Sequence, residues 1–485
     1  MIPMTLQEIA SVVGGTVDGD PGTEVTGEAF LDSRAPVPGG LFVAVAGERA
    51  DGHDYAERAH GGGAAAVLGS RATGVPAVLV EDPVTALGLL ARHVLDSLDV
   101  TVLALTGSQG KTGTKDYLGQ VLATAGETVA TAGNLNNEYG VPLTVLRADR
   151  ATAYLVVEMG ARGIGHISYL CRIAPPSVAA VINVGTAHLG EFGSREAIAV
   201  AKGEIVEALP ADGTAVLNAD DELTAAMAAR TSARPLTFGV AGDVTWRGME
   251  LDDLGRPSFE LGYDGAWAPV RLAQSGAHQV ANAAAAAAMA LAVGLPLSQV
   301  ADALTAARPV SRWRMEIAER ADGLVVVNDA YNANPASMVA AIGSLAEIGR
   351  RGRRRTVAVL GEMKELGPGA VEDHRSVGRA VAEAGIDVVV AVGEAAGGIA
   401  EGAESAAGWS GEVVRTAGRD QACDWVRENV AAHDVVLVKA SRGAALEVVA
   451  ECLLGSGDAD PARPAPSATA NRNDDPEVDP EVQQP

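Results

Sequence analysis

Apolar runs alternate with amphipathic segments along most of the chain after residue 100. The runs VTVLALT, AYLVVEM and SVAAVINVG are short, and each is followed by a helix-like stretch. Continuous apolar runs of this length are typical of strands buried on both faces of a parallel sheet. The alternation begins again after about Pro309 with LVVVND, TVAVLGEM, DVVVAVGE and DVVLVKAS. The pattern therefore predicts two successive α/β domains, each with a parallel sheet covered by helices.

The two ends of the chain have different patterns. Before residue 99, short β-type runs such as GGLFVAVAG and AVLVEDP are separated by many glycines, with one helix-like segment near Ala86–Leu98, which predicts a small α/β domain. Beyond Gly455 the chain is poor in apolar residues and rich in Pro and Asp, which predicts a disordered tail. We therefore expect four segments, at residues 1–98, 99–310, 311–455 and 456–485.

Length, composition and charge agree with this division and exclude one class of partner. The chain has 485 residues, which at roughly 150 residues per domain predicts about three domains. Hydrophobic residues make up 48% and charged residues 20%, as in folded globular proteins. The 37 basic and 62 acidic residues give a net charge of −25, which opposes binding to nucleic acid. Any phosphate-bearing ligand must therefore be held by a local site.

The sequence shows neither a secretory signal nor a membrane segment. The first residues lack a basic start followed by an apolar core, and the longest apolar stretch, Val280–Leu295, is shorter than the roughly 20 residues of a membrane span. Cys171, Cys423 and Cys452 are far apart and without metal-ligand spacing, which favours structural thiols in a reducing compartment. We therefore expect a cytoplasmic protein that does not insert into a membrane.

A glycine-rich loop lies between the run VTVLAL and a helix-like stretch. Its residues are Thr106, Gly107, Ser108, Gln109, Gly110, Lys111 and Thr112. Strand, loop and helix in this order direct several N–H groups at one anion, Lys111 adds a positive charge, and the Thr112 hydroxyl can ligate Mg²⁺. Leu105 stands where the longer phosphate-loop pattern has its first glycine, so this loop has the shorter form. The pattern predicts a nucleotide site, with an ordinary turn between strand and helix as the alternative.

Two further polar side chains follow predicted parallel strands. Glu158 lies near the end of AYLVVEMG, and His188 lies near the end of SVAAVINVGTAHLG. Ligands of open α/β sheets gather at the carboxyl ends of the strands, so either side chain can hold a metal ion there. A strand-end acid and a loop imidazole without a ligand stay open as alternatives. On the residues alone, Lys202 is a surface lysine of a helix-like segment.

Taken together, the motifs resemble the Mur ligases, the ATP-dependent peptide synthetases that build the cytoplasmic peptidoglycan precursor. The shared segments are TGSQGKT, NLNNEYGVPLT, VVEMGARGIGHI, NVGTAHLGEFGSREAIAVAKGEI, HQVANAAAA, SRWRMEI and VKASRG, which occur in the family order between about residues 33 and 443. The resemblance implies an N-terminal domain for the UDP end of the precursor, a central ATPase domain and a C-terminal Rossmann-like domain for the incoming amino component.

Two segments of the C-terminal part resemble one member of the family in particular. DAYNANPASM (329–338) and LGEMKELG (360–367) are similar to signatures of the ligase that adds D-alanyl-D-alanine to UDP-N-acetylmuramoyl-tripeptide. The Asp-Asn-Pro-Arg type of segment of the preceding ligase is absent from the sequence. The resemblance therefore implies two small-molecule substrates besides ATP, and we expect the enzyme to be a monomer.

The resemblance also implies roles for individual residues. It implies nucleotide contacts for Asn282, Arg312 and Asp329. It also implies that two Mg²⁺ are bound by Thr112, Glu158, His188 and Lys202, with Lys202 carbamylated. The implied precursor contacts are Ser33, Arg34, Asn134 and Asn137, and the implied adenine-side loop contains Asn332 and Asn334. The implied dipeptide contacts are Lys439, Ser441 and Arg442. The alternative for these last three residues is that they only cap the start of a helix. Lys111, Lys202 and His188 are the expected catalytic residues.

The expected reaction is formation of an acyl phosphate from ATP and a peptide carboxylate, followed by attack of an amine. His188 is better interpreted as a metal ligand than as the base for that amine. The alternatives are the third-residue-adding ligase of the same family, a folylpolyglutamate-synthetase-like ligase, a nucleotide-dependent switch and a binding module. A switch that binds GTP requires an Asn-Lys-x-Asp motif, which the sequence lacks.

Overall fold

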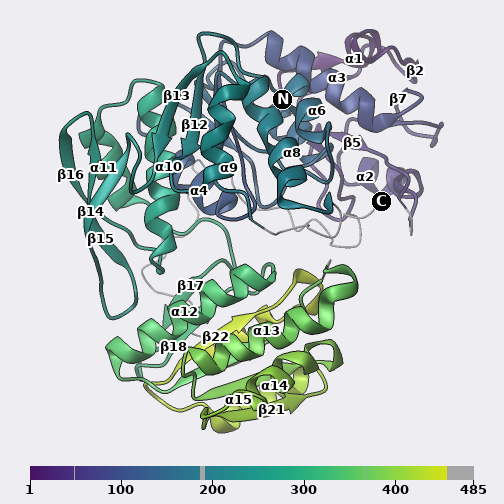
Figure 1. Ribbon diagram of the computed structural model, residues 1–485. Helices are drawn as coiled ribbons and strands as arrows, with labels where there is room; N and C mark the ends of the chain where they lie inside the picture. The colour runs from purple at the N-terminus through teal and green to yellow at the C-terminus, as the bar shows by residue number, and fades with distance from the viewer. Residues whose placement is uncertain (48–49, 186–191, 365, 456–485) are drawn as a thin grey trace.

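The computed structural model describes residues 1–47, 50–185, 192–364 and 366–455. Three main sheets follow one another along the chain, each with helices packed against it, and Figure 1 shows the three parts in purple, teal and green to yellow. The predicted α/β fold is confirmed. His188 and the segment 456–485, for which the sequence predicts a metal ligand and a disordered tail, lie outside the described residues.

The N-terminal part is a small α/β unit. Its sheet has the order β2-β7-β6-β5-β4, in which β2 is antiparallel to β7 and the other pairs are parallel. Thr5 and Glu8 form a capping box that starts α1, because each side chain accepts a hydrogen bond from the other residue's main-chain N–H. The elements are β1 (Met4–Thr5), α1 (Leu6–Val13), β2 (Thr16–Asp18), β3 (Glu24–Val25), β4 (Ala29–Phe30), β5 (Leu41–Val43), α2 (Ala56–Gly61), β6 (Ala66–Gly69), β7 (Ala77–Leu79) and α3 (Pro83–Asp96).

The central part is built on a six-stranded parallel sheet with the order β13-β12-β11-β8-β10-β9. Leu103 and Leu105 of β8 belong to a core shared with α4 and α10, while Val102 and Ala104 belong to a second core on the other face. Burial on both faces explains the continuous apolar run. The elements are β8 (Thr101–Thr106), α4 (Lys111–Leu122), β9 (Thr128–Ala130), α5 (Gly140–Leu146), β10 (Tyr154–Glu158), α6 (His166–Ile173), β11 (Val178–Val181), α8 (Arg195–Glu207), β12 (Thr214–Asn218), α9 (Glu222–Ala225), β13 (Arg234–Phe238), α10 (His278–Ala292) and α11 (Leu297–Ala306).

A three-stranded antiparallel sheet, which the sequence did not predict, is inserted between β13 and α10. Its strands are β14 (Thr245–Leu251), β15 (Pro257–Tyr263) and β16 (Ala266–Arg271), in the order β14-β15-β16. Phe259, Leu261 and Val270 point into the core beside α10, and polar residues between them are exposed. This half-exposed pattern lacks the long apolar runs that identified the parallel strands. Figure 1 places this sheet at the left edge of the central part.

The C-terminal part is a second six-stranded sheet with the order β17-β18-β22-β19-β20-β21. Only β17 runs antiparallel to its neighbour. The four predicted apolar runs form β18, β19, β20 and β22, whose residues are buried. The elements are β17 (Glu316–Glu319), β18 (Val325–Asn328), α12 (Pro335–Gly352), β19 (Thr356–Leu360), α13 (Ala370–Glu383), β20 (Val388–Val392), α14 (Gly397–Glu404), β21 (Glu412–Thr416), α15 (Arg419–Asn429), β22 (Val435–Lys439) and α16 (Glu447–Leu454).

The limits of the three parts fall in short connections. Helix α3 ends at Asp96 before β8 begins at Thr101, and α11 ends at Ala306 before β17 begins at Glu316. We propose domain boundaries near residues 98 and 310 in these connections. Helix α10 holds the longest apolar stretch, and no helix in the described part of the chain is long and apolar enough to cross a membrane.

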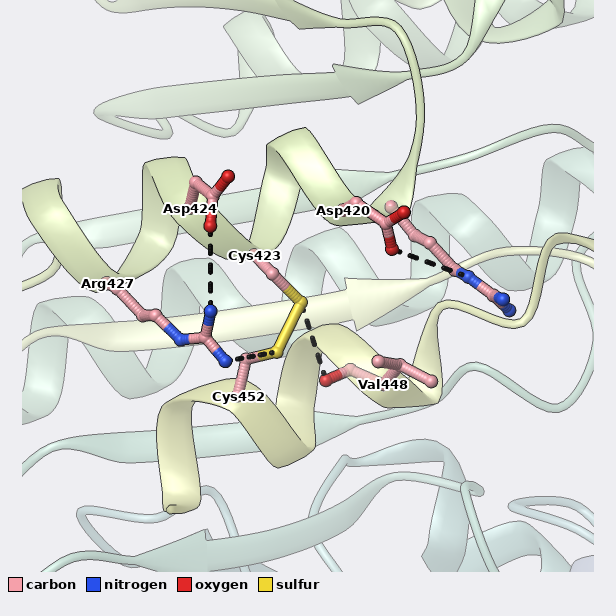
Figure 2. The surroundings of a disulfide bond; sticks show 7 residues. Asp420, Cys423, Asp424, Arg427, Val448 and Cys452 are labelled. Carbon is pink, nitrogen blue, oxygen red and sulfur yellow. Dashed lines mark hydrogen bonds and ion pairs between the residues drawn. A yellow bond between two sulfur atoms is a disulfide. The ribbon is translucent and has the colours of Figure 1, made fainter. Parts of the chain in front are cut away.

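Two cysteines of the C-terminal part form a disulfide, which corrects the expectation of three free thiols. Cys423 on α15 is bonded to Cys452 on α16, with their Cα atoms 5.9 Å apart, and Cys171 is a buried free thiol. Figure 2 shows the bond joining the two helices, with Arg427 donating to Cys452 Sγ at 3.4 Å. Spacing along the chain gave no sign of this pair, because packing of α15 against α16 brings the cysteines together.

We expect replacement of Cys423 by Ser to lower the free energy of unfolding of the C-terminal domain. The bond closes a loop of 29 residues, and a loop of this length contributes roughly 3 to 4 kcal/mol by restricting the unfolded chain. Urea titration of C423S and of the unreduced parent protein measures the difference. Reductant should weaken the parent protein and leave C423S unchanged. Titration of three thiols in the unreduced, denatured parent protein would contradict the bond.

Candidate active site

The glycine-rich loop joins β8 to α4 as the sequence predicts. Gly110 precedes the first residue of α4 with φ of 78°, a left-handed conformation that favours glycine. A Cβ atom at Gly110 would lie 2.3 Å from Oδ1 of Asn282 on α10, so a side chain there would have to displace the Asn282 amide. The loop is therefore held between the sheet and α10, and Asn282 lies directly beside it.

Lys111 is the first residue of α4 and forms no salt bridge with an acidic side chain in the described part of the chain. Its Nζ donates to the main-chain carbonyl of Gly107 at 2.8 Å. Burial lowers the pKa of Lys111, the charge of Glu158 raises it, and the nearby charge of Arg314 lowers it. A partly buried cation stabilised mainly by a loop carbonyl is placed to bind an anion, because phosphate oxygens would replace the hydration that it has lost.

Asn183, which the sequence analysis did not single out, holds the glycine-rich loop in place. Its Oδ1 accepts hydrogen bonds from the main-chain N–H groups of Ser108 and Gln109, at 3.1 and 2.9 Å. Its Nδ2 donates to the carbonyl of Gln109 at 3.1 Å, and its own carbonyl accepts from Ser108 N–H. The signal was present in the run SVAAVINVG, where a polar residue lies two positions after the buried strand β11.

We expect the Asn183→Ala variant to bind ATP more weakly. The substitution removes three side-chain hydrogen bonds, each worth about 1 kcal/mol, so the KM for ATP should rise roughly tenfold or more. Steady-state kinetics with ATP varied measures the change. Asn429→Ala is the matched control, because the Asn429 amide donates to a carbonyl on α15, outside the loop. An unchanged KM for ATP in N183A would contradict this role.

Glu158 lies at the end of β10 as predicted, and it is fully buried. Its Oε2 accepts from the hydroxyl of Thr112 at 3.1 Å, and its Oε1 accepts from Nδ2 of Asn136 at 2.7 Å. The Thr112 hydroxyl and the Glu158 carboxylate are the hard oxygen ligands that Mg²⁺ prefers. The pair sits directly behind the phosphate loop, so the residues present fit a magnesium ion between nucleotide and protein.

Lys202 is buried on α8, which corrects its interpretation from the residues alone as a surface lysine. Burial and, to a smaller extent, the charge of Lys111 lower the pKa of Lys202 to about 7, against the charge of Glu158, which raises it. Folding therefore brings Lys202 to the same group of charges as Lys111 and Glu158, although 91 positions separate the two lysines. A lysine with this pKa is partly neutral near pH 7 and can react as an amine.

The C-terminal part contributes a buried ion pair. Nζ of Lys439 lies 2.6 Å from Oδ2 of Asp329 and also donates to the carbonyl of Asn332 at 2.8 Å. Oδ1 of Asp329 accepts from the N–H of Met315 at 3.0 Å. Lys439 is the last residue of β22, and these two contacts hold its ammonium in place. Asn334 caps α12 by accepting from Ser337 N–H at 2.9 Å.

Two arginines of the segment between α11 and β17 line the cavity, and only one of them was predicted. The predicted residue, Arg312, lines its wall. Arg314 was missed. Its guanidinium lies 4.1 Å from the centre of the Tyr331 ring, and its buried Nε has no hydrogen-bond partner among the described residues. Its charge lowers the pKa of Lys111, so the third domain presents a cation towards the phosphate loop.

The remaining predicted residues lie at different parts of the site. Ser441 accepts from the N–H of Lys364 at 2.9 Å, and Arg442 lies 4.2 Å from the Trp313 ring centre. Ser441 makes no side-chain cap hydrogen bond to the short turn that follows, so the capped helix start receives no support. Asn134 and Asn137 line the cavity, and Asn137 accepts from Tyr139 and Gly140 N–H. Ser33 is buried and Arg34 pairs with Asp32 at 2.9 Å, and neither is among the residues that line the cavity.

All three parts of the chain line one cavity of about 2090 Å³. The phosphate loop, Glu158 and Lys202 come from the central part, Asp329 and Lys439 from the C-terminal part, and Leu31 and Thr85 from the N-terminal part. Sites for one small ligand usually have volumes of about 300 to 1,000 Å³, so this cavity can hold several substrates together. A phosphate loop that opens into a cavity between three domains defines a nucleotide-dependent enzyme that acts on bound substrates.

Comparison with known proteins gives the family. Residues 24–94 match the description "Mur ligase family, catalytic domain", residues 105–290 match "Mur ligase middle domain", and residues 313–442 match "Mur ligase, glutamate ligase domain". The UDP-N-acetylmuramoyl-tripeptide–D-alanyl-D-alanine ligase of Mycobacterium tuberculosis is 46% identical, and the match covers 96% of this chain and 100% of the relative. The chain belongs to the Mur ligase family.

Two solved structures are similar over nearly the whole chain. MurF from Acinetobacter baumannii has a TM-score of 0.81 and 33% identity, with 92% of this chain and 98% of that chain covered. The MurF ligase from Thermotoga maritima in complex with ADP has a TM-score of 0.75 and 32% identity, with 88% and 97% covered. The three-domain α/β fold of this chain is therefore that of the MurF ligases.

Proposed function

We propose that the enzyme joins D-alanyl-D-alanine to UDP-N-acetylmuramoyl-tripeptide with ATP, giving the UDP-linked pentapeptide. The observation that carries this function is the single cavity in which the phosphate loop faces residues of all three domains, in a chain 46% identical to a ligase with that name. The third-residue-adding ligase and the folylpolyglutamate-synthetase-like ligase, the alternatives from the sequence, have no observation in their favour. Hydrolysis of ATP has to be coupled to amide formation within this cavity.

The first step is activation of the peptide carboxylate, which is a poor electrophile in water. A carboxylate oxygen attacks the γ-phosphorus of ATP, the bond to the β,γ-bridging oxygen breaks, and ADP leaves. Two anions approach each other in this step, so it needs positive charge. Lys111 in the loop and Arg314 from the third domain supply cations on the phosphate side. The N–H groups at the start of α4 orient the terminal phosphates.

In the second step the free amine of D-alanyl-D-alanine attacks the acyl carbon, and phosphate leaves from the tetrahedral intermediate. The acyl phosphate must be shielded from water, because hydrolysis competes with the amine. The C-terminal domain supplies the opposite wall of the cavity, and the segment Ala306–Trp313 connects it to the central domain. We propose that this segment is the hinge on which the C-terminal domain closes.

We propose that Thr112, Glu158, His188 and Lys202 hold Mg²⁺ beside the phosphates. Thr112 and Glu158 are already in contact, and Lys202 shares their charged environment, while His188 lies outside the described residues. A bound magnesium ion would neutralise charge on the phosphate oxygens during transfer. Asn136 and the N–H of Glu158, which donates to Thr131, hold the carboxylate in its orientation.

We propose that Lys202 is carbamylated, because its pKa of about 7 makes the required neutral amine available. The amine lone pair attacks the carbon of CO₂, and the nitrogen loses a proton, which gives an anionic carbamate. At pH 8 about nine tenths of the Lys202 amine is neutral and at pH 6 about one tenth, so uptake should rise with pH around 7. NMR of the nucleotide-free enzyme with ¹³C-bicarbonate should show a carbamate signal that K202R lacks. The same signal in both proteins would contradict the proposal.

Roles for the other predicted site residues, inside and outside the cavity, belong to the same proposal. Asn282, Arg312 and Asp329, beside or opposite the phosphate loop, would contact the nucleotide, with Asn332 and Asn334 in the adjoining loop. The remaining proposed contacts are Ser33, Arg34, Asn134 and Asn137 for the precursor, and Lys439, Ser441 and Arg442 for the dipeptide. We propose a monomer that works in the cytoplasm, where ATP and the UDP-linked precursor occur together.

Phosphate release tests the proposed function most directly. Release should require ATP, the UDP-linked tripeptide and D-alanyl-D-alanine together, and omission of any one should reduce it to background. The mass of the product should increase by one dipeptide. Release that proceeds with ATP alone would favour a nucleotide-dependent switch, and activity with free amino acids in place of the dipeptide would favour another ligase of the family.

A further inference from the structure

We infer that Glu138 and Arg162 form the subsite for the side chain of the residue whose carboxyl is activated, and that they select a side chain ending in both an ammonium and a carboxylate. This inference rests on the proposed function and specifies the acceptor peptide. NH1 of Arg162 lies 3.9 Å from Oε1 of Glu138, and both residues line the cavity.

The two residues are carried by segments that meet beside the predicted magnesium ligand. Glu138 lies two residues after Asn136, whose side chain donates to Glu158, and Arg162 lies four residues after Glu158 itself. The N–H of Gly160 donates to the carbonyl of Asn136 at 2.8 Å, which joins the two segments. A peptide carboxyl at the phosphate loop would therefore have its own side chain within reach of this pair.

The segment that carries Arg162 is anchored at its far end as well. Glu204, on the same helix as Lys202, accepts from the N–H groups of Gly165 and Ser168 at 2.5 and 2.9 Å. The N–H of Arg162 donates to Nδ1 of His166 at 3.3 Å. The guanidinium is thus presented from a backbone that is fixed at Gly160 and at the start of α6, so its position relative to Glu158 is defined.

Charges of both signs act at this wall of the cavity. Burial raises the pKa values of Tyr139 and Tyr169, and the charges of Glu138 and Asp82 raise them further, while Arg162 opposes this at Tyr139. A side chain with only an ammonium would meet the guanidinium as a like charge. A zwitterionic end group can instead pair its carboxylate with Arg162 and its ammonium with Glu138.

The existing contact between Glu138 and Arg162 is easily replaced by a ligand. The side chains are 27% and 41% exposed, and ion pairs this accessible contribute at most about 1 kcal/mol. Insertion of a zwitterion therefore displaces this weak pair and forms two charge-assisted contacts. Because both partners remain partly hydrated, we expect discrimination of roughly fivefold or more, not of several orders of magnitude.

Two acceptors test the inference, UDP-N-acetylmuramoyl-tripeptides that end in 2,6-diaminopimelate or in lysine. The unaltered enzyme should have a kcat/KM at least about fivefold higher for the first, mainly through a lower KM. Arg162→Gln should reduce this value and leave that for the lysine peptide unchanged or higher, which removes the preference. Glu138→Gln should reduce both values, since both peptides carry an ammonium. Arg375→Gln, which removes an exposed arginine of α13 paired with Glu401, is the control.

The possible results separate this inference from the proposed function. Equal kcat/KM values of the unaltered enzyme for the two peptides, or equal losses for both peptides in R162Q, would overturn the subsite. Turnover with neither peptide would instead overturn the proposed function. Binding of ATP by R162Q and E138Q, measured by calorimetry, should match that of the parent enzyme, and a variant that fails this check is replaced by Arg162→Lys or Glu138→Asp.

Discussion

Replacement of Lys111 by Ala should reduce turnover on the order of 10²-fold or more, which is the effect of losing one preorganised electrostatic contact to a developing charge. Lys111 is held by the carbonyl of Gly107 and has lost much of its hydration. Its charge is therefore available to the phosphoryl group throughout the transfer. Phosphate release with all three substrates at saturation measures the change in kcat.

A second variant and a stability measurement separate charge from packing. Lys111→Met keeps most of the apolar stem and should lose activity as severely as K111A. Burial already disfavours the charged form of Lys111, so neither substitution should lower the free energy of unfolding of the nucleotide-free protein by much. Near-normal turnover in either variant would remove Lys111 from the mechanism.

Replacement of Glu158 by Gln should also reduce turnover by about 10²-fold or more and raise the magnesium concentration needed for half-maximal activity. The side chain keeps its size, but it loses the negative charge that would offset a divalent cation. The pKa values of Lys111 and Lys202 should fall in E158Q, because the charge of Glu158 raises both. Activity as a function of magnesium concentration measures the first effect.

Two controls show whether the charge of Glu158 is responsible. Glu319→Gln removes an acid at the end of another strand, where it is half-exposed and 3.7 Å from Arg354, and should leave kcat unchanged. Asn136→Ala removes only the contact that orients the carboxylate, so its loss should be smaller, about 10- to 100-fold. An unaltered magnesium dependence in E158Q would contradict a role for Glu158 as a ligand.

Much of the fold could be predicted from the sequence, for one physical reason. A strand buried on both faces must be apolar at every position, so β8, β10, β11 and the four inner strands of the C-terminal sheet were visible as continuous runs. The antiparallel sheet β14-β15-β16 was missed because it is exposed on one side and its polar residues interrupt any run. The Cys423–Cys452 disulfide was missed because it depends on helix packing.

The site was predictable where its chemistry is local. The loop Thr106–Thr112 needs only a strand, glycines, a lysine and a helix start, all adjacent in sequence. Asn183 and Arg314 were missed because each acts on that loop from a distant segment. The pairing of Lys439 with Asp329, 110 residues away, could not be predicted, because it depends on the fold of the C-terminal sheet.

The sequence by itself determined the α/β class, the phosphate loop and the family to which the chain belongs, because these depend on order and spacing along the chain. Only the tertiary structure decided which charges share one site. It buries Lys202 beside Lys111 and Glu158, pairs Lys439 with Asp329 and brings Glu138 to Arg162. Electrostatic interactions depend on distance and burial in space, and neither quantity is written in the order of the residues.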